Sequence, residues 1–204
     1  MSPSTVLLLA LCCAAPRWAS AASPQTSPQT SPQAGPQAGP QTWRVSAGEV
    51  SYRLEHKFHL VEGRSRSVEG LLLIDDAGAK VMVRLPVKSF DSGNANRDAH
   101  MLEVVEGARY PFVVLKALVP APALHLKDAP GAKLALTAEL DFHGVKARRT
   151  ITVAVTRRSP RQMTVTFAFP VSLEAHRVER PSLLFIKVKD AIQLSGTLRL
   201  EAKP

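Results

Sequence analysis

The sequence predicts an all-β domain, and two observations lead to this prediction. Eight segments between residues 51 and 200 alternate apolar and polar residues with a period of two, as strands with one buried face do. Many of these segments are separated by short turns that contain Gly, Pro or Asn. Strands with one apolar and one polar face pair antiparallel. Eight such strands in one small domain therefore form either a sandwich or a closed barrel.

The expected strands follow one another along most of the chain. They are 51–60, 64–74, 80–87, 112–119, 133–142, 145–155, 162–169 and 193–200. Alternation is clearest in 133–142, where Leu136 and Leu140 share one face while Thr137 and Glu139 share the other. The same pattern places Tyr52, Leu54, His56, Phe58 and Leu60 on one face of 51–60. We expect these apolar faces to line the interior of the domain.

One segment, 96–106, breaks the period of two. Met101, Leu102 and Val105 recur there at helical spacing, Asn96 can cap the helix, and Asp98 lies in its favourable first turn. A short helix is therefore expected between two strands. A second irregular stretch, 174–188, holds either another short helix or a long loop.

The N-terminus predicts export. Residues 6–15 form an apolar run of signal-peptide length, and the residues before Ala21 are small, so we expect cleavage after Ala21. From Pro24 to Pro40 a proline recurs every four residues, always followed by Gln, which is typical of an extended spacer. The expected organisation is a signal peptide (1–21), a Pro/Gln-rich disordered linker (22–42) and a β domain (43–204). The expected location is the periplasm or the outside of the cell.

The composition limits the classes of function. The chain of 204 residues carries a net charge of +9, but only 5% of its residues are aromatic, and no stretch interleaves aromatic with basic residues for base stacking. We therefore expect no nucleic-acid partner. The densest basic residues are Lys146, Arg148, Arg149, Arg157, Arg158 and Arg161. They form either a solvated outer face or a contact for anionic lipid head groups.

The chemistry-bearing residues do not form a recognisable catalytic motif. Ser92, Asp98 and His100 lie close in sequence, but no nucleophile elbow surrounds the serine, so we interpret this stretch as a turn and a helix start. The histidines lack strong metal spacing, and no glycine loop could cradle a phosphate. Both cysteines, Cys12 and Cys13, lie inside the expected signal peptide. We predict no enzyme activity, no catalytic residues, no metal and no cofactor.

Three residues interrupt the expected pattern. His56 would lie on an apolar face, where it either orients a ligand's head group or bonds to the backbone. His143 precedes Gly144 where a hairpin turn is expected. Arg149 also falls on an apolar face. Either a bulge corrects its register, or a buried arginine pairs with a carboxylate or a bound anion.

An ordered set of segments resembles the YceI-like family of secreted bacterial proteins, over nearly all of 43–201. The matching segments are HKFHLVEGRSRSVEG (56–70), VKSFDSGNANRDAHMLE (87–103), ARYPFVVLKA (108–117), LDFHGVKARRTITV (140–153), RPSLL (180–184) and VKDAIQLSGTL (188–198). Within them, Arg97-Asp98 and Tyr110-Pro111 are the more specific pairs. The resemblance implies an antiparallel closed β-barrel of about eight strands, lipocalin-like, with one or two short helices. It also implies export and a long apolar tunnel, since characterised members are associated with polyisoprenoid or other amphiphilic chains.

The alternation and the resemblance together favour a binding protein. We expect a protein that sequesters or carries a polyisoprenoid, an acyl chain or a similar amphiphile inside the barrel. The expected ligand-binding residues are Tyr52, Leu54, His56, Phe58, Val83, Leu85, Leu136, Leu140, Val153, Val165 and Phe167. The alternative is a scaffold of the cell envelope that binds no lipid. Peripheral contact with an anionic membrane surface and a homodimer stay open as further interactions.

Overall fold

The computed structural model describes residues 39–56, 59–124, 132–180, 182–183 and 186–203. The long strands are β1 (Gln41–His56), β2 (His59–Ser65), β3 (Glu69–Asp75), β4 (Gly78–Pro86), β5 (Phe112–Pro120), β6 (Ala132–Phe142), β7 (Val145–Ser159), β8 (Gln162–Ser172) and β11 (Ala191–Ala202). A separate hairpin pairs β9 (Ser182–Leu183) with β10 (Ile186–Lys187). The helices are α1 (Ala95–Val104), α2 (Ala121–Leu124) and the 3₁₀ turns η1 (Val87–Ser89) and η3 (Glu174–His176).

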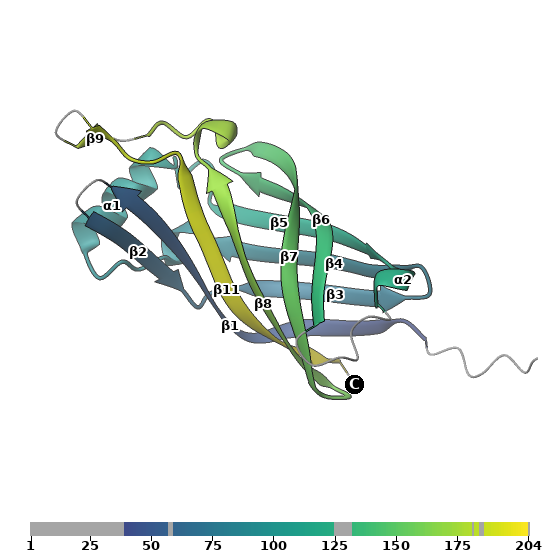
Figure 1. Cartoon of the computed structure of the whole chain (residues 1–204). Helices are drawn as coiled ribbons and strands as arrows, with labels where there is room; N and C mark the ends of the chain where they lie inside the picture. The colour runs from purple at the N-terminus through teal and green to yellow at the C-terminus, as the bar shows by residue number, and fades with distance from the viewer. Residues whose placement is uncertain (1–38, 57–58, 125–131, 181, 184–185, 204) are drawn as a thin grey trace, which may run out of the picture. The chain divides into compact units, whose positions relative to one another are not determined.

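Eight strands close into one antiparallel barrel (Figure 1). From β3 to β8 each strand pairs with its neighbour in sequence, β8 pairs with β11, and β11 returns to pair with β1, which also pairs with β3. This ring confirms the predicted closed barrel and excludes the sandwich. Closure of the ring leaves β2, which among the described strands pairs with β1 alone, as the strand with a free edge.

Strand β1 is long enough to pair with two different strands along one of its edges. Its first residues pair with β3, and its second half pairs with β2, while its other edge runs along β11. The predicted strands 51–60 and 64–74 are therefore wrong in their bounds. The chain reverses between His56 and His59, which pair with each other, and it breaks again at 66–68. Leu60 consequently lies on the outer face of β2 and is 54% exposed.

The interior of the barrel is built as the alternation predicts. Along β6, Leu134, Leu136, Ala138, Leu140 and Phe142 are all buried, while Lys133, Ala135 and Thr137 are exposed. Strands β7 and β8 repeat this arrangement with Ile151, Val153 and Val155, and with Met163 and Phe169. Because most inward residues of the eight strands are apolar, the core and the lumen share the same walls.

Helix α1 forms where predicted, but it begins earlier. Asn94, not Asn96, is the cap, since its Oδ1 accepts from the backbone N–H of Arg97 at 3.0 Å. Side chains of the helix form hydrogen bonds with the preceding loop. Asp98 accepts from the backbone N–H of Ser92, and Arg97 donates from Nε to the Ser92 hydroxyl at 2.8 Å. Asp91, next to Ser92, exchanges two backbone hydrogen bonds with Arg64 of β2.

The predicted turn at His143 and Gly144 joins β6 to β7. Both residues have positive φ, at 52° and 71°, which is the conformation of a two-residue type I′ hairpin. A Cβ on Gly144 would lie 2.5 Å from Cε1 of Tyr110, so the position also needs glycine for space.

Arg149 lies on the inner face of β7. The pairing of β6 with β7 continues from Ala132 to Phe142 without a shift, so no bulge corrects the register. The guanidinium donates to the main-chain carbonyl of Pro170 and lies 5.9 Å from the ring centre of Phe169. Of the two alternatives, the bulge is therefore excluded, and the contacts of the guanidinium among the described residues are a carbonyl and an aromatic ring.

Candidate functional site

The barrel interior contains an apolar cavity, which we call the lumen chamber. It measures about 140 Å³ and is lined by side chains from every strand of the ring. All of its lining residues are Val, Leu, Ile, Ala, Met or Phe. A cavity without polar groups offers water no hydrogen-bond partner, so it is suited to an apolar ligand.

A second cavity, the helix-side chamber, lies where α1 covers one end of the barrel. It measures about 200 Å³. Its walls come from β1, β2, α1 and the segment that follows β8. Leu85, Val113, Leu140 and Leu194 line both chambers, so we call these four residues the waist. The two chambers therefore adjoin within the barrel interior, and together they form an elongated space that suits an elongated ligand.

Nine of the eleven predicted site residues line these chambers. Val83, Leu136, Val153, Val165 and Phe167 line the lumen chamber, Tyr52 and Leu54 line the helix-side chamber, and Leu85 and Leu140 line both. Phe58 lies outside the described residues, and His56 ends β1 with a side chain that is not among those described. Their role in binding stays a prediction for all eleven residues.

Among the lining residues that sequence reasoning missed, one group lies on α1 and at its C-terminal end. Arg97, His100, Met101, Val104 and Val105 all line the helix-side chamber. Counted from Arg97, the other four follow at three, four, seven and eight residues, which is the spacing of one face of a helix. This spacing is visible in the sequence alone. The pattern we used instead included Leu102, which packs against the core but lines neither chamber.

Polar groups reach the chambers only beside α1. Among the residues that line the helix-side chamber, Tyr52, Arg97 and His100 alone are polar. Burial raises the pKa of the Tyr52 phenol, Asp98 raises it further, and Arg97 opposes this shift. The phenol therefore stays protonated at neutral pH and can donate a hydrogen bond. Arg97 and His100 are exposed and Tyr52 is buried, so these three residues, which we call the polar rim, reach from the chamber wall to its solvent-facing edge.

Gly63 provides the space for Tyr52. A Cβ at this position of β2 would lie 2.4 Å from Cε1 of the Tyr52 ring. The ring also meets Phe90 edge-on, with 5.1 Å between the ring centres. The backbone of β2 and the Phe90 side chain thus hold the Tyr52 ring against the helix-side chamber.

A histidine pair lies behind one wall of the helix-side chamber. His143 contacts Glu106, with Nε2 and Oε1 3.3 Å apart, and the Tyr110 ring lies 4.8 Å away. His176 is completely buried, and its Nδ1 donates to the carbonyls of Phe142 and Val145. Burial lowers the pKa of His176 and Arg149 adds to this, while the two carbonyls and Asp141 oppose it. His176 is therefore neutral, and its Nε2 has no partner among the described residues.

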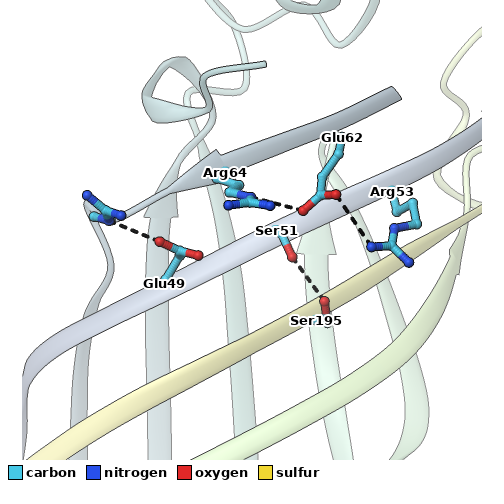
Figure 2. Close-up of polar contacts among 7 residues, drawn as sticks. Glu49, Ser51, Arg53, Glu62, Arg64 and Ser195 are labelled. Atoms are coloured by element: carbon cyan, nitrogen blue, oxygen red, sulfur yellow. Dashed lines mark hydrogen bonds and ion pairs between the residues drawn. The ribbon is translucent and has the colours of Figure 1, made fainter. Parts of the chain in front are cut away.

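A third hollow, lined by polar groups, lies on the outside of the barrel along β1 and β2. Four of its five charged residues form ion pairs: Arg64 with Glu62, as Figure 2 shows, and Arg66 with Glu49. Arg53 also reaches Glu62, and the hydroxyls of Ser51 and Ser195 join β1 to β11 at 3.0 Å. Because these charges neutralise each other locally, the hollow is a weaker candidate site than the chambers.

The alternative catalytic arrangement does not assemble in the described part of the chain. Ser92 bonds to Asp98 and Arg97, whereas His100 lies beside Glu103 with 63% of its side chain exposed. Within the described ranges, no three His, Cys, Asp or Glu residues gather as a metal site. None of the described helices combines the length and apolarity needed to cross a bilayer.

The fold and its chambers define a class: a closed eight-stranded barrel with an apolar interior and a polar rim at one end. The family model of the YceI-like domain matches residues 43–200. The chain belongs to the YceI-like domain family, which confirms the resemblance seen in the sequence.

Solved structures share this fold at low sequence identity. A polyisoprenoid-binding domain from Saccharophagus degradans, implicated in plant cell wall breakdown, aligns with a TM-score of 0.65 at 18% identity, covering 79% of this chain and 98% of its own. BcnA from Burkholderia cenocepacia gives 0.62 at 19% identity, covering 74% and 95%. The Campylobacter jejuni YCEI protein gives 0.57 at 15% identity, covering 74% and 90%. A search of the curated proteins finds no match.

Proposed function

We propose that this protein is an exported, non-enzymatic carrier that holds one apolar or amphiphilic chain in its barrel. The observation that carries the proposal is the asymmetry of the interior. The lumen chamber is wholly apolar, and polar side chains occur only at the rim of the helix-side chamber. A polyisoprenoid or an acyl chain with one polar end matches this arrangement.

The energetics favour a slender chain. Each buried CH₂ contributes about 0.8 kcal/mol, so affinity grows with the length of chain that passes the waist. Specificity then comes from the rim, where Tyr52 donates a hydrogen bond and Arg97 and His100 can meet an anionic head. The neighbour described as a polyisoprenoid-binding domain supports this class of ligand.

Native mass spectrometry with organic extraction tests the proposal directly. The protein is purified from an exporting bacterial host, and we expect one apolar molecule per chain. The same spectrum reports a homodimer, which stays a prediction, and the N-terminal residue reports cleavage after Ala21. A ligand-free mass, with no uptake of added isoprenoid alcohols or fatty acids, would contradict the carrier and favour the scaffold alternative.

A substitution at the rim tests the polar end. His100→Ala removes a largely exposed side chain, so the fold should be unaffected. We expect it to weaken binding of an isoprenoid phosphate by several-fold while leaving the isoprenoid alcohol nearly unchanged. Ala99→Ser, at the neighbouring exposed position, is the matched control. Equal effects on both ligands would place the polar end of the ligand elsewhere.

A further inference from the structure

The end of the barrel away from α1 carries a cluster of five arginines, which we call the basal patch: Arg44, Arg157, Arg158, Arg161 and Arg199. All five are exposed. They belong to the ends of β1, β7 and β11 and to the turn between β7 and β8, which Figure 1 shows away from α1.

Strand pairing brings these arginines together. Arg44 lies opposite Glu201, which in turn lies opposite Gln162, next to Arg161. Arg161 reaches across to the carbonyl of Ala202 at 3.3 Å. Arg157 is paired with Met163 and lies 6.0 Å from the ring centre of Trp43.

The charges of the basal patch are not neutralised by neighbours. No carboxylate of the described residues lies within ion-pair distance of any of the five arginines. Glu201 is the one acid in the paired rows named above. The outer face of β1 and β2 is different, because Arg53, Arg64 and Arg66 each meet a glutamate there (Figure 2).

From this arrangement we infer that the basal patch docks the protein onto the surface of an anionic phospholipid bilayer. Guanidinium groups bind phosphate oxygens in a bidentate manner, and several exposed cations on one surface are attracted to an anionic membrane. The patch also lies beside one end of the lumen chamber, since Met163, which pairs with Arg157, and Leu200, which follows Arg199, both line that chamber. With the base on the bilayer, the rim at α1 faces away from it.

A bilayer fits better than a nucleic acid. The aromatic residue of this end, Trp43, is completely buried and so offers no surface for base stacking. The choice of a lipid surface rests on the proposed function, because a carrier of apolar chains works beside membranes. The docking itself can be measured whether or not a ligand is bound.

Vesicle co-sedimentation tests the inference with the purified protein. We use phosphatidylcholine vesicles with and without about one third phosphatidylglycerol, at about 50 mM and about 500 mM NaCl. Binding is expected for the anionic vesicles at low salt, with loss at high salt. Arg158→Glu/Arg161→Glu/Arg199→Glu should weaken it about tenfold or more.

The matched control is Lys88→Glu/Lys116→Glu/Lys146→Glu, which changes the net charge equally at exposed positions away from the basal patch. It should retain binding within about threefold, and the corresponding glutamine variants replace the glutamate ones if folding suffers. Equal binding to neutral vesicles, equal losses in both triple variants, or displacement from the vesicles by duplex DNA would each overturn the inference. Extraction from the patch variant separates the two proposals, since docking can be lost while the bound chain is retained.

Discussion

The imidazole of His143 donates from Nδ1 to the main-chain carbonyl oxygen of His176, 3.0 Å away. His176 reciprocates by donating to the carbonyls on either side of the β6–β7 turn, those of Phe142 and Val145. This exchange joins the turn to η3, whose neighbours Leu173 and Val178 line the helix-side chamber. The pair therefore holds one wall of the proposed binding site.

Removing His143 should loosen that wall. His143→Ala leaves the carbonyl of His176 without its donor in a buried position, so we expect a loss of about 1–3 kcal/mol in the free energy of unfolding. Urea denaturation measures this loss. His100→Ala removes an exposed imidazole and should change the same quantity by less than about 0.5 kcal/mol. Similar losses in both variants would show that the pair does not stabilise the wall.

His176 should make the protein sensitive to acid. Burial lowers its pKa in the folded state, with Arg149 adding to the shift, while the carbonyls of Phe142 and Val145 and the Asp141 carboxylate oppose it. Below the unfolded pKa of about 6.5, the unfolded chain therefore binds a proton that the folded protein excludes, and stability falls as pH falls.

His176 should make the free energy of unfolding decrease by up to about 1.4 kcal/mol per pH unit between about pH 6.5 and the lower pKa of the folded state, and it should have no effect above about pH 7.5. Denaturation at a series of pH values measures the slope. His176→Gln keeps an amide donor and should have a shallower acid slope than the wild type. An unchanged slope would assign the acid sensitivity to other groups.

The cap of α1 can be verified with two neighbouring asparagines. Asn94→Ala removes the acceptor for the Arg97 N–H, so it should cost about 1 kcal/mol. Asn96→Ala replaces an exposed residue inside the helix and should be neutral or slightly stabilising. Thermal unfolding of both variants measures these changes. A larger loss of stability in Asn96→Ala than in Asn94→Ala would contradict the cap seen in the structure.

The waist should control the length of chain that the barrel accepts. Val113→Phe adds volume where both chambers meet, so we expect long isoprenoids to be excluded while short chains still bind. Val114, the next residue of β5, is in neither lining, and Val114→Phe is the matched control. Mass spectrometry of competitive uptake measures the chain length. The same preference in both variants would show that ligands do not pass the waist.

The Tyr52 phenol should lose its proton at a higher pH than a tyrosine in the unfolded chain. Since burial raises the pKa of its phenol, the folded protein keeps this proton after the unfolded chain has lost it. Stability should therefore decrease as pH rises above about 10. The ultraviolet absorbance of tyrosinate follows the titration, and Tyr52→Phe should remove the late component. A late component that persists in Tyr52→Phe would contradict the prediction.

Several features of the fold could be predicted because they depend on local sequence. Alternation identified the inward residues of β4, β6, β7, β8 and β11, since the period of two follows from the backbone of any strand. The turn at His143 and the helix near Met101 were found for the same reason. The bounds around residues 56–68 were wrong, because alternation continues through a tight reversal and hides the turn.

The sequence by itself determined the class of protein: strands with one apolar face, a family resemblance and no motif for a cofactor. Only the tertiary structure decided that β1 divides its edge between β2 and β3, that α1 lines a second chamber and that five arginines gather at the base. It also placed Arg149 inside, against Pro170 and Phe169. The physical reason is the separation of the interacting residues along the sequence. The two faces of a strand are set by adjacent residues, whereas these features depend on contacts between strands and helices that are far apart in the sequence.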